Sequence, residues 1–146
     1  MPLNIPASAL PLTSADLELI NFARETIDAT TDADVDGDGI HTMGAAVRAS
    51  DGRVFAGVNI YHFTGGPCAE LVALGAARAA GALVLTHLVA VGNHGRGVKS
   101  PCGKDRQILA DYYPDVRVIL DAPGGPVSVL AQDLLPLAFD HRAEQI

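Results

Sequence analysis

Two cysteines and two carboxylates form the most chemically informative pattern in this chain of 146 residues. Cys68 follows a proline and precedes Glu70 by two positions, and Cys102 follows a second proline and precedes Asp105 by three. Three protein ligands with one open position are typical of a catalytic zinc site. The spacing therefore predicts that Cys68, Cys102 and Asp105 bind Zn²⁺. Glu70 would not bind the metal but would transfer protons.

Each of these residues also has an ordinary structural explanation. A free cysteine is among the residue types most often found in an apolar core. An acidic side chain in the first turn of a helix often only complements the helix dipole. The joint pattern favours the metal site, because both cysteine–carboxylate pairs occur at a helix start that a proline marks.

Two helices are predicted to position the pairs. Pro67 suits the first helical position of a helix that runs to about Ala80. Ser100 suits the N-cap of a second helix, with Pro101 as its first residue and an end near Tyr113. Helix N-termini favour thiolate over thiol. Crossover helices of a parallel α/β arrangement begin at the same edge of the sheet, so we expect the two N-termini to meet.

The remaining elements predict an α/β protein. Thr13 and Asp16 have capping-box spacing at the start of a first helix. Hydrophobic patterning and turn residues predict strands over 43–49, 53–60, 88–91 and 116–120, a turn over 121–126 and a C-terminal helix over 127–135. This order implies a mixed sheet with parallel strands joined by right-handed helical crossovers.

Length and composition narrow the class of protein. The length predicts a single domain over 1–146, with an irregular segment over 1–13. A net charge of −7 argues against nucleic-acid binding and suits a small neutral or cationic ligand. Two cysteines are too few for a secreted disulfide scaffold. We see no signal peptide, and the apolar stretch 81–92 is too short to span a membrane, so we expect a cytoplasmic protein.

Longer segments carry a family resemblance. The segments GVNIYHFTGGPCAELVALG, SPCGKDRQ and LLP resemble the cytidine deaminase superfamily, and most closely its blasticidin S deaminase branch. The resemblance covers roughly residues 43–136. It implies a three-layer α-β-α sandwich, a homotetramer with one zinc per subunit, and the hydrolytic release of ammonia from a cytosine-containing nucleoside or nucleoside antibiotic.

The family motif also implies roles for individual residues. It makes Cys68 and Cys102 zinc ligands and Glu70 the acid and base. It implies further that Asn59 bonds the sugar, that the Ser100 carbonyl meets the ring amine, and that His41 lies near the base.

This chain departs from the family pattern at three places. Asp105 replaces a third cysteine, which preserves the ligand charge but predicts a more weakly held zinc. Tyr61 replaces a ribose-binding Glu, as it does in the antibiotic branch. Phe139 and His141 stand where that branch carries Tyr and Trp, which alters the expected pocket. We also expect His62, in the loop before Cys68, to line the pocket.

Two other functions remain open at this point. The altered C-terminus allows a deaminase of another amino-substituted heterocycle. Asp105 allows a catalytically silent binding protein that has lost zinc. By contrast, the acidic loop 32–38 is predicted to be a solvated turn and not a calcium site, because the twelfth position counted from Asp32 is Met43 instead of a bidentate Glu.

Overall fold

The computed structural model describes residues 4–36 and 38–144. These residues form a seven-stranded mixed sheet in the order β1-β7-β6-β4-β2-β3, with β5 paired to β4. The strands are β1 (Leu10–Pro11), β2 (Met43–Ala49), β3 (Val54–Val58), β4 (Leu85–Gly92), β5 (Gly97–Lys99), β6 (Arg117–Ala122) and β7 (Gly125–Leu130).

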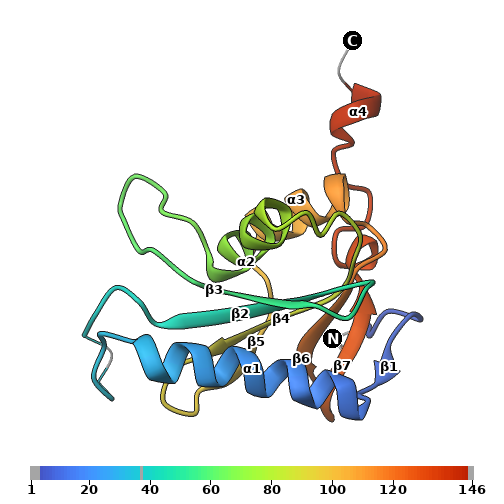
Figure 1. The fold of residues 1–146 in the computed structure, drawn as a ribbon. Coiled ribbons are helices and arrows are strands. Elements are labelled where there is room, and N and C mark those ends of the chain that lie inside the picture. Colours follow the sequence, from blue (N-terminus) through green and yellow to red (C-terminus); the bar gives the residue numbers. More distant parts are fainter. Residues whose placement is uncertain (1–3, 37, 145–146) are drawn as a thin grey trace.

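Helices cover both faces of this sheet. They are α1 (Ser14–Thr30), α2 (Ala69–Ala79), α3 (Gly103–Tyr112), the 3-10 helix η1 (Ala131–Leu134) and α4 (His141–Glu144). Figure 1 shows α1 along one face of the sheet and α2 and α3 on the opposite face. The expected three-layer α-β-α fold with a mixed central sheet is therefore confirmed.

Each face of the sheet buries its own apolar cluster. Leu19, Ala23 and Ile27 of α1 are at most 1% exposed and pack on Val89 and Ile119 of the central strands. These α1 residues recur every four positions, which places them on one side of the helix. The opposite face packs alanine-rich α2 and Leu109 of α3 against alternate residues of the same strands.

The start of α1 is fixed as its sequence predicts. Thr13 is the N-cap: its hydroxyl accepts from the Asp16 backbone N–H at 3.2 Å, and its own N–H donates to Asp16 Oδ2 at 2.9 Å. This capping box satisfies two backbone donors that the first helical turn would otherwise leave unpaired.

Strand direction places the starts of α2 and α3 at one edge of the sheet. β2 pairs antiparallel with both β3 and β4, so β3 and β4 run in the same direction. β4 also pairs parallel with β6. α2 follows β3 and begins near the edge where β3 and β4 end. β5 runs back only a short way along β4, from Gly97 opposite Gly92 to Lys99 opposite Ala90, so α3 also begins near that edge. Among the described residues, β4 and β6 are the only neighbouring strands that pair in parallel.

Both predicted helix starts were placed too early. Pro67 and Pro101 precede the helices, and Cys68 and Cys102 are the N-caps, with extended backbone at φ −65°, ψ 156° and φ −72°, ψ 172°. The predicted N-cap at Ser100 is therefore wrong. Proline disfavours the helical region for the residue before it, and here the extended conformation also continues through the cysteine that follows.

The predicted C-terminal helix over 127–135 is wrong. Residues 125–130 form β7, antiparallel to β6, and a 3-10 turn follows. Val127 and Val129 alternate with Pro126 and Ser128, which is the period of a strand. The turn predicted over 121–126 is shorter in the structure, because β6 continues to Ala122 and β7 begins at Gly125. β1, inside the segment expected to be irregular, pairs with β7.

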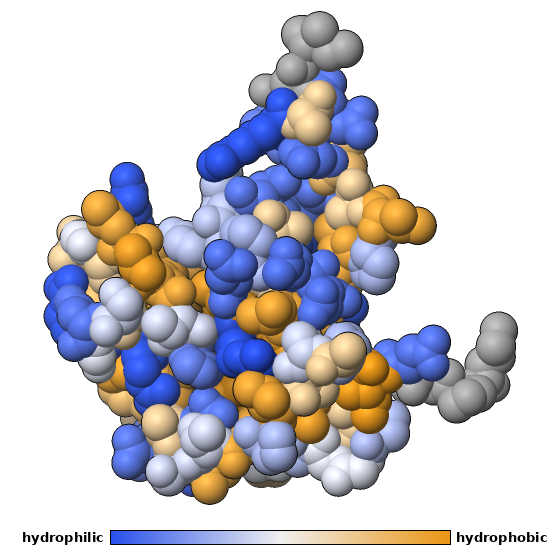
Figure 2. All heavy atoms as spheres, turned by 90° about the vertical axis from the view of Figure 1, so that its right-hand side faces the viewer, coloured by the Kyte–Doolittle hydropathy of each residue, from blue (hydrophilic) through white to orange (hydrophobic). Residues whose placement is uncertain are grey.

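Figure 2 shows the face that includes the C-terminal segment, which stands away from the body of the protein. Hydrophilic and hydrophobic side chains are mixed over this face, without one dominant apolar area. Among the described residues there is no helix with the length and apolarity needed to cross a membrane.

Candidate active site

The two cysteines meet at the N-termini of α2 and α3. Their Sγ atoms lie 3.8 Å apart, too far for a disulfide, and both thiols are free. Neither thiol caps its own helix by a hydrogen bond. Two thiolates on one tetrahedral zinc, each at about 2.3 Å, stand about 3.8 Å apart. The separation of the two sulfur atoms therefore fits a shared zinc ion.

Asp105 completes the group. One ligand atom each from Cys68, Cys102 and Asp105 lies within 4.8 Å of the others. Asp105 is only 1% exposed, and neither of its carboxylate oxygens has a hydrogen-bond partner among the described residues. An unpartnered buried carboxylate is costly unless a cation binds it. The residues present thus fit a metal ion, and the juxtaposition predicted from the two motifs is observed.

The same cluster concentrates acidic groups in a small volume. Burial, followed by the nearby Asp105 carboxylate, raises the pKa of the Cys68 thiol to about 12. Burial and then Asp105 also raise the pKa of Glu70 to about 8. The helix N-termini alone therefore do not produce the thiolate at Cys68 that we expected. A bound divalent cation would reverse this balance, because its charge favours the deprotonated ligands.

A cavity of about 240 Å³ is lined by both cysteines and by the two carboxylates, Glu70 and Asp105. Glu70, 5% exposed, lines it from the first turn of α2. Asn59 and Tyr61 line it from the segment after β3, and Ser100 lines it from the segment before α3. Seven of the ten residues proposed from the sequence therefore meet around one cavity: Asn59, Tyr61, Cys68, Glu70, Ser100, Cys102 and Asp105.

The Asn59 side chain is largely engaged in holding the wall of this cavity. Its Oδ1 accepts from the backbone N–H groups of Thr42 and Met43 at 2.8 and 2.9 Å, and its Nδ2 donates to the Ile40 carbonyl at 3.1 Å. One amide hydrogen remains for a ligand. His41 does not line the cavity, but its Nδ1 is 2.7 Å from the Asn59 carbonyl oxygen.

Two other residues proposed for the pocket lie outside it. His62 is exposed, contacts the Thr64 hydroxyl and stacks at a tilt on Phe63, with ring centroids 4.5 Å apart. Phe139 is 58% exposed and lines a different cavity, beside the C-terminal end of α3. Its carbonyl accepts from Gln107 Nε2 at 2.9 Å. A role of either residue in substrate binding stays a prediction.

Sequence reasoning missed part of the lining. Met43, Ile60 and Gly66 also face the cavity. The Ile60 N–H donates to the Pro67 carbonyl at 3.1 Å, which closes the base of the loop between them. A Cβ at Gly66 would stand 1.9 Å from the Ile60 carbonyl oxygen. The Gly65-Gly66 pair was the available signal, because paired glycines permit a close backbone approach of this kind.

The chain is similar to known deaminases along most of its length. It is 31% identical over 137 residues to a blasticidin-S deaminase of Bacillus cereus, which covers 88% of this chain and 94% of that protein. The structure of a cytidine deaminase from Burkholderia pseudomallei matches with a TM-score of 0.67 and 30% identity, over 88% of this chain and all of that one.

A second solved structure agrees. A cytidine deaminase from Mycobacterium tuberculosis matches with a TM-score of 0.64 and 31% identity, over 85% of this chain and 97% of that one. No protein-family model matches the sequence.

Proposed function

Because the chain belongs to the cytidine deaminase superfamily, with a deaminase relative that spans nearly its whole length, we propose that it is a zinc-dependent deaminase of cytosine-containing nucleosides. The observation that carries this proposal is the group formed by Cys68, Cys102 and Asp105 beside the buried Glu70. In a catalytically silent protein without zinc, the buried Asp105 carboxylate, which has no hydrogen-bond partner among the described residues, would only cost stability.

Cys68, Cys102 and Asp105 would hold the zinc ion. Two thiolates and one carboxylate give three negative ligands and leave one position open, as catalytic zinc sites require. A zinc ion bound there would supply the nucleophile by lowering the pKa of a bound water molecule to about 7. The oxygen ligand donates less charge than a third thiolate, so we expect a weaker and more Lewis-acidic site.

Glu70 would move the protons of the reaction. Its carboxyl group lies in the cavity wall two residues after Cys68, and its burial favours the protonated form. In the reaction it would take one proton from the attacking water and give it to the ring nitrogen. It would then take the proton of the hydroxyl group that the water has added to the ring and give it to the departing amine. The atoms of the reaction then balance. The oxygen of the water becomes the carbonyl oxygen of the product, and its two protons go to the ring nitrogen and to the released ammonia.

The rest of the cavity would bind the nucleoside. The remaining amide hydrogen of Asn59 and the hydroxyl of Tyr61 are available to sugar hydroxyl groups, and the Ser100 carbonyl to the ring amine. Met43 and Ile60 add apolar contacts for the ring. A cavity of about 240 Å³ suits a base and part of a sugar better than a larger substrate.

Glu70→Gln tests the mechanism. We expect this variant to lose a factor of about 10²–10⁴ in kcat for ammonia release, because general acid–base catalysis contributes about that much. Its circular dichroism spectrum and zinc content should match the unmodified protein. Glu25→Gln, on the exposed side of α1, is the matched control and should retain full activity. Full activity in Glu70→Gln would refute the mechanism.

Metal analysis separates the enzyme from the silent binding protein. Protein purified without chelators should contain about one zinc per chain. A value near zero that added zinc does not raise would favour the binding protein.

A panel of cytosine nucleosides, blasticidin S and other amino-substituted heterocycles then identifies the substrate class by ammonia release. The expected homotetramer stays a prediction, which light scattering of the purified protein would test.

A further inference from the structure

The chain at the start of β2 forms a narrow wall between two cavities. Thr42 lines a cavity of about 590 Å³ together with Asn93 and Arg96. The next residue, Met43, lines the proposed nucleoside pocket of about 240 Å³, and Tyr61 lines both cavities. Close packing on every side, which fixes residues of the core, is not available to such a wall. Its position therefore depends on hydrogen bonds.

Asn59 bonds this wall to the segment that follows β3. Its side chain makes three hydrogen bonds of 2.8 to 3.1 Å to the backbone of residues 40, 42 and 43. Its own backbone N–H donates to the Met43 carbonyl at 3.2 Å. The Asn59 carbonyl oxygen is bonded by a side chain instead, because His41 Nδ1 lies 2.7 Å from it. Asn59 is thus held through its side chain, its N–H and its carbonyl.

The peptide group between Asn59 and Ile60 is held at both of its polar atoms. Its carbonyl oxygen meets His41, and its N–H donates to the Pro67 carbonyl at 3.1 Å. A peptide group is planar, so two hydrogen bonds on opposite sides fix its rotation. This rotation sets the directions of the Asn59 and Ile60 side chains, and both residues line the pocket. Without His41, the peptide group would be held on one side only.

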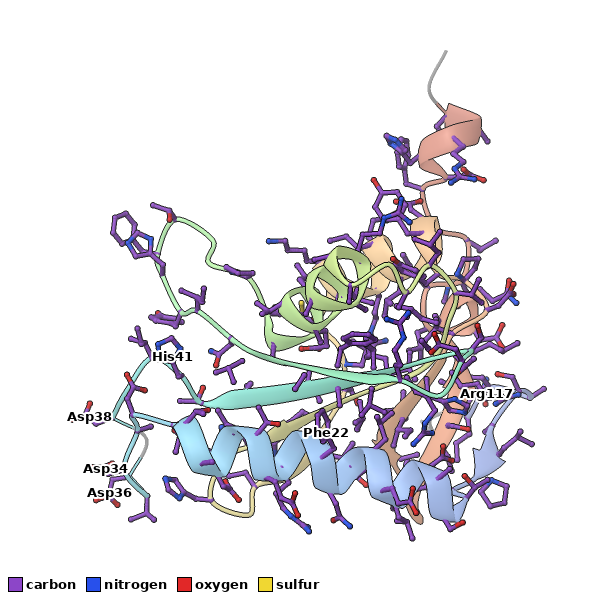
Figure 3. All side chains as sticks on the ribbon, in the orientation of Figure 1. Phe22, Asp34, Asp36, Asp38, His41 and Arg117 are labelled. Atoms are coloured by element: carbon purple, nitrogen blue, oxygen red, sulfur yellow. The ribbon has the colours of Figure 1, made fainter. Side chains whose placement is uncertain are left out.

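His41 itself starts from an anchored backbone. Its N–H donates to Asp32 Oδ1 at 2.8 Å, and its carbonyl accepts from the Thr31 hydroxyl at 2.6 Å. Thr31 is the C-cap of α1. Figure 3 shows His41 at the end of the molecule that carries Asp34 and Asp38. The imidazole therefore connects the chain at the end of α1 to the segment after β3.

The partner atom also fixes the tautomer of His41. A carbonyl oxygen only accepts hydrogen bonds, so Nδ1 carries the hydrogen whenever this bond is present. In the neutral ring Nε2 is then free of hydrogen. A second proton would add at Nε2, so protonation of the ring leaves the bond to Asn59 in place.

We propose that His41 is a positioning residue for the substrate. Its Nδ1–H holds the peptide group after Asn59, which keeps the Asn59 amide in the pocket wall with its remaining hydrogen available to a sugar hydroxyl group. His41 acts through Asn59 and not by contact with the substrate, in agreement with its place outside the cavity lining. The proposal rests on the proposed function, since it assumes that a nucleoside occupies the pocket beside Glu70.

Two substitutions separate the hydrogen bond from the volume of the side chain. His41→Asn keeps an N–H donor in nearly the same place, because an asparagine Nδ2 and a histidine Nδ1 are each bonded to Cγ. His41→Leu has a similar shape without a donor. His87→Leu is the control for a general loss of stability. His87 pairs with Arg117 across β4 and β6, and Figure 3 shows Arg117 at the end of the molecule opposite His41.

Nucleosides that differ in their hydroxyl groups measure the effect. Cytidine, 2′,3′-dideoxycytidine and 5′-deoxycytidine are titrated by calorimetry into zinc-loaded Glu70→Gln protein, in which we expect slow turnover. Cytidine should bind about fivefold tighter than the analogue that lacks the hydroxyl group bound by Asn59, the amount expected for one hydrogen bond. Adding His41→Leu should reduce this ratio to about one. Adding His41→Asn or His87→Leu should leave it at about fivefold.

The tautomer provides a readout that needs no substrate. Nitrogen-15 spectra of the metal-free protein, well above the ordinary histidine pKa of about 6.5, distinguish a ring nitrogen that carries hydrogen from one that does not. The His41 signals are identified by their absence in His41→Leu. We expect the hydrogen on Nδ1. A hydrogen on Nε2 alone would overturn the proposal.

The outcomes separate this proposal from the proposed function. An unchanged ratio in His41→Leu overturns the positioning role, and so does an equal loss in His41→Leu and either His41→Asn or His87→Leu. A ratio of one for both analogues before any change at His41 overturns it as well. Ammonia release from cytidine by the protein with Glu70 intact is measured in parallel. Release with a ratio that does not depend on His41 refutes the positioning role alone. A ratio that depends on His41 without release refutes the proposed reaction alone.

Discussion

The N-termini of α1 and α3 each carry an aspartate at the same helical position, but only the aspartate of α1 forms a hydrogen bond with its N-cap residue. Asp16 and Asp105 each stand three residues after the N-cap, and both are at most 2% exposed. Asp16 Oδ2 accepts from the Thr13 N–H at 2.9 Å. Asp105 has no such contact among the described residues, and its N-cap is a cysteine that does not cap.

Under the proposed function, this difference separates an aspartate that stabilises a helix start from one that binds the metal ion. A threonine N-cap and an aspartate at the third position satisfy each other. The cysteine N-cap makes no such bond, and a ligand atom of Asp105 lies within 4.8 Å of both cysteine sulfur atoms. In Asp16 only Oδ1 lacks a hydrogen bond, and it lies 3.6 Å from His87 Nε2.

Removing the Asp105 carboxylate should give the largest effect. In Asp105→Ala we expect zinc affinity to fall by more than about 100-fold, the upper range for loss of an outer contact, because a direct ligand is lost. Deaminase activity should fall with it. Asp16→Ala should retain one zinc per chain. The measurement is chelator competition with metal analysis, and equal zinc binding in both variants would contradict the comparison.

Asp105→Cys sharpens the same test. A third thiolate is the softer ligand and should bind zinc more tightly than the unmodified site does. Chelator competition measures the change in affinity. A weaker site in this variant would mean that Asp105 does not bind the metal directly.

Removal of zinc should lower stability through the N-termini of α2 and α3 and not through the N-terminus of α1. A ligand present at 100 times its dissociation constant stabilises the folded state by about 2.7 kcal/mol. We therefore expect dialysis against a chelator to lower the free energy of unfolding of the unmodified protein and of Asp16→Ala by similar amounts. Urea denaturation of both proteins, with and without zinc, provides the measurement. Asp105→Ala should be insensitive to the chelator.

In the metal-free protein the two aspartates should respond with opposite signs. Asp105→Asn removes a buried charge that has no partner, so its free energy of unfolding should rise by about 1 kcal/mol. Asp16→Asn weakens the capping box and should lose about 1 kcal/mol. Urea denaturation in the presence of a chelator measures both. A loss of stability in both variants would show that Asp105 also serves folding.

The smallest effect concerns pH at the α1 contact. Burial lowers the pKa of His87, Arg48 and Arg117 lower it further, and Asp16 partly opposes them. The unfolded chain then binds a proton more readily than the folded protein does. Stability from the neutral imidazole is therefore complete above a pH of about 6.5 and declines as the pH falls below it. In His87→Gln, urea denaturation at pH 7.5 and 5.5 should show a smaller difference.

The sequence predicts the site better than it predicts the elements around it. The Pro-Cys pairs and the two carboxylates occur at fixed spacings, and helix starts at one sheet edge bring them together. The error at Pro67 and Pro101 is one of local geometry, because a proline is compatible both with the first helical position and with the extended segment before an N-cap. Only the backbone angles of Cys68 and Cys102 decide between them.

The missed strand β7 and the cavity lined by Thr42, Asn93 and Arg96 were not predicted for a different reason. Residues 127–135 contain apolar residues at spacings that suit both a helix and a strand, and pairing with β6 decides the outcome. The cavity at Arg96 and His94 depends on contacts between segments 54 to 66 positions apart in the chain, such as Arg96 with the Thr42 carbonyl and His94 with Asp28. No local pattern contains that information. His62 was proposed for the pocket on its position in the loop alone, and the structure directs it to the exposed tip.

The loop between Ile60 and Pro67 should tolerate insertions, because its two ends are joined at the base. The hydrogen bond from Ile60 N–H to the Pro67 carbonyl holds the two ends together. Residues 62–65 lie beyond that bond. Loop closure costs only about 0.6 kcal/mol for each doubling of length. Insertions, affinity tags or randomised peptides introduced at this tip would leave the positions of Tyr61 and Cys68 intact, which makes the loop a natural starting point for engineering new substrate ranges.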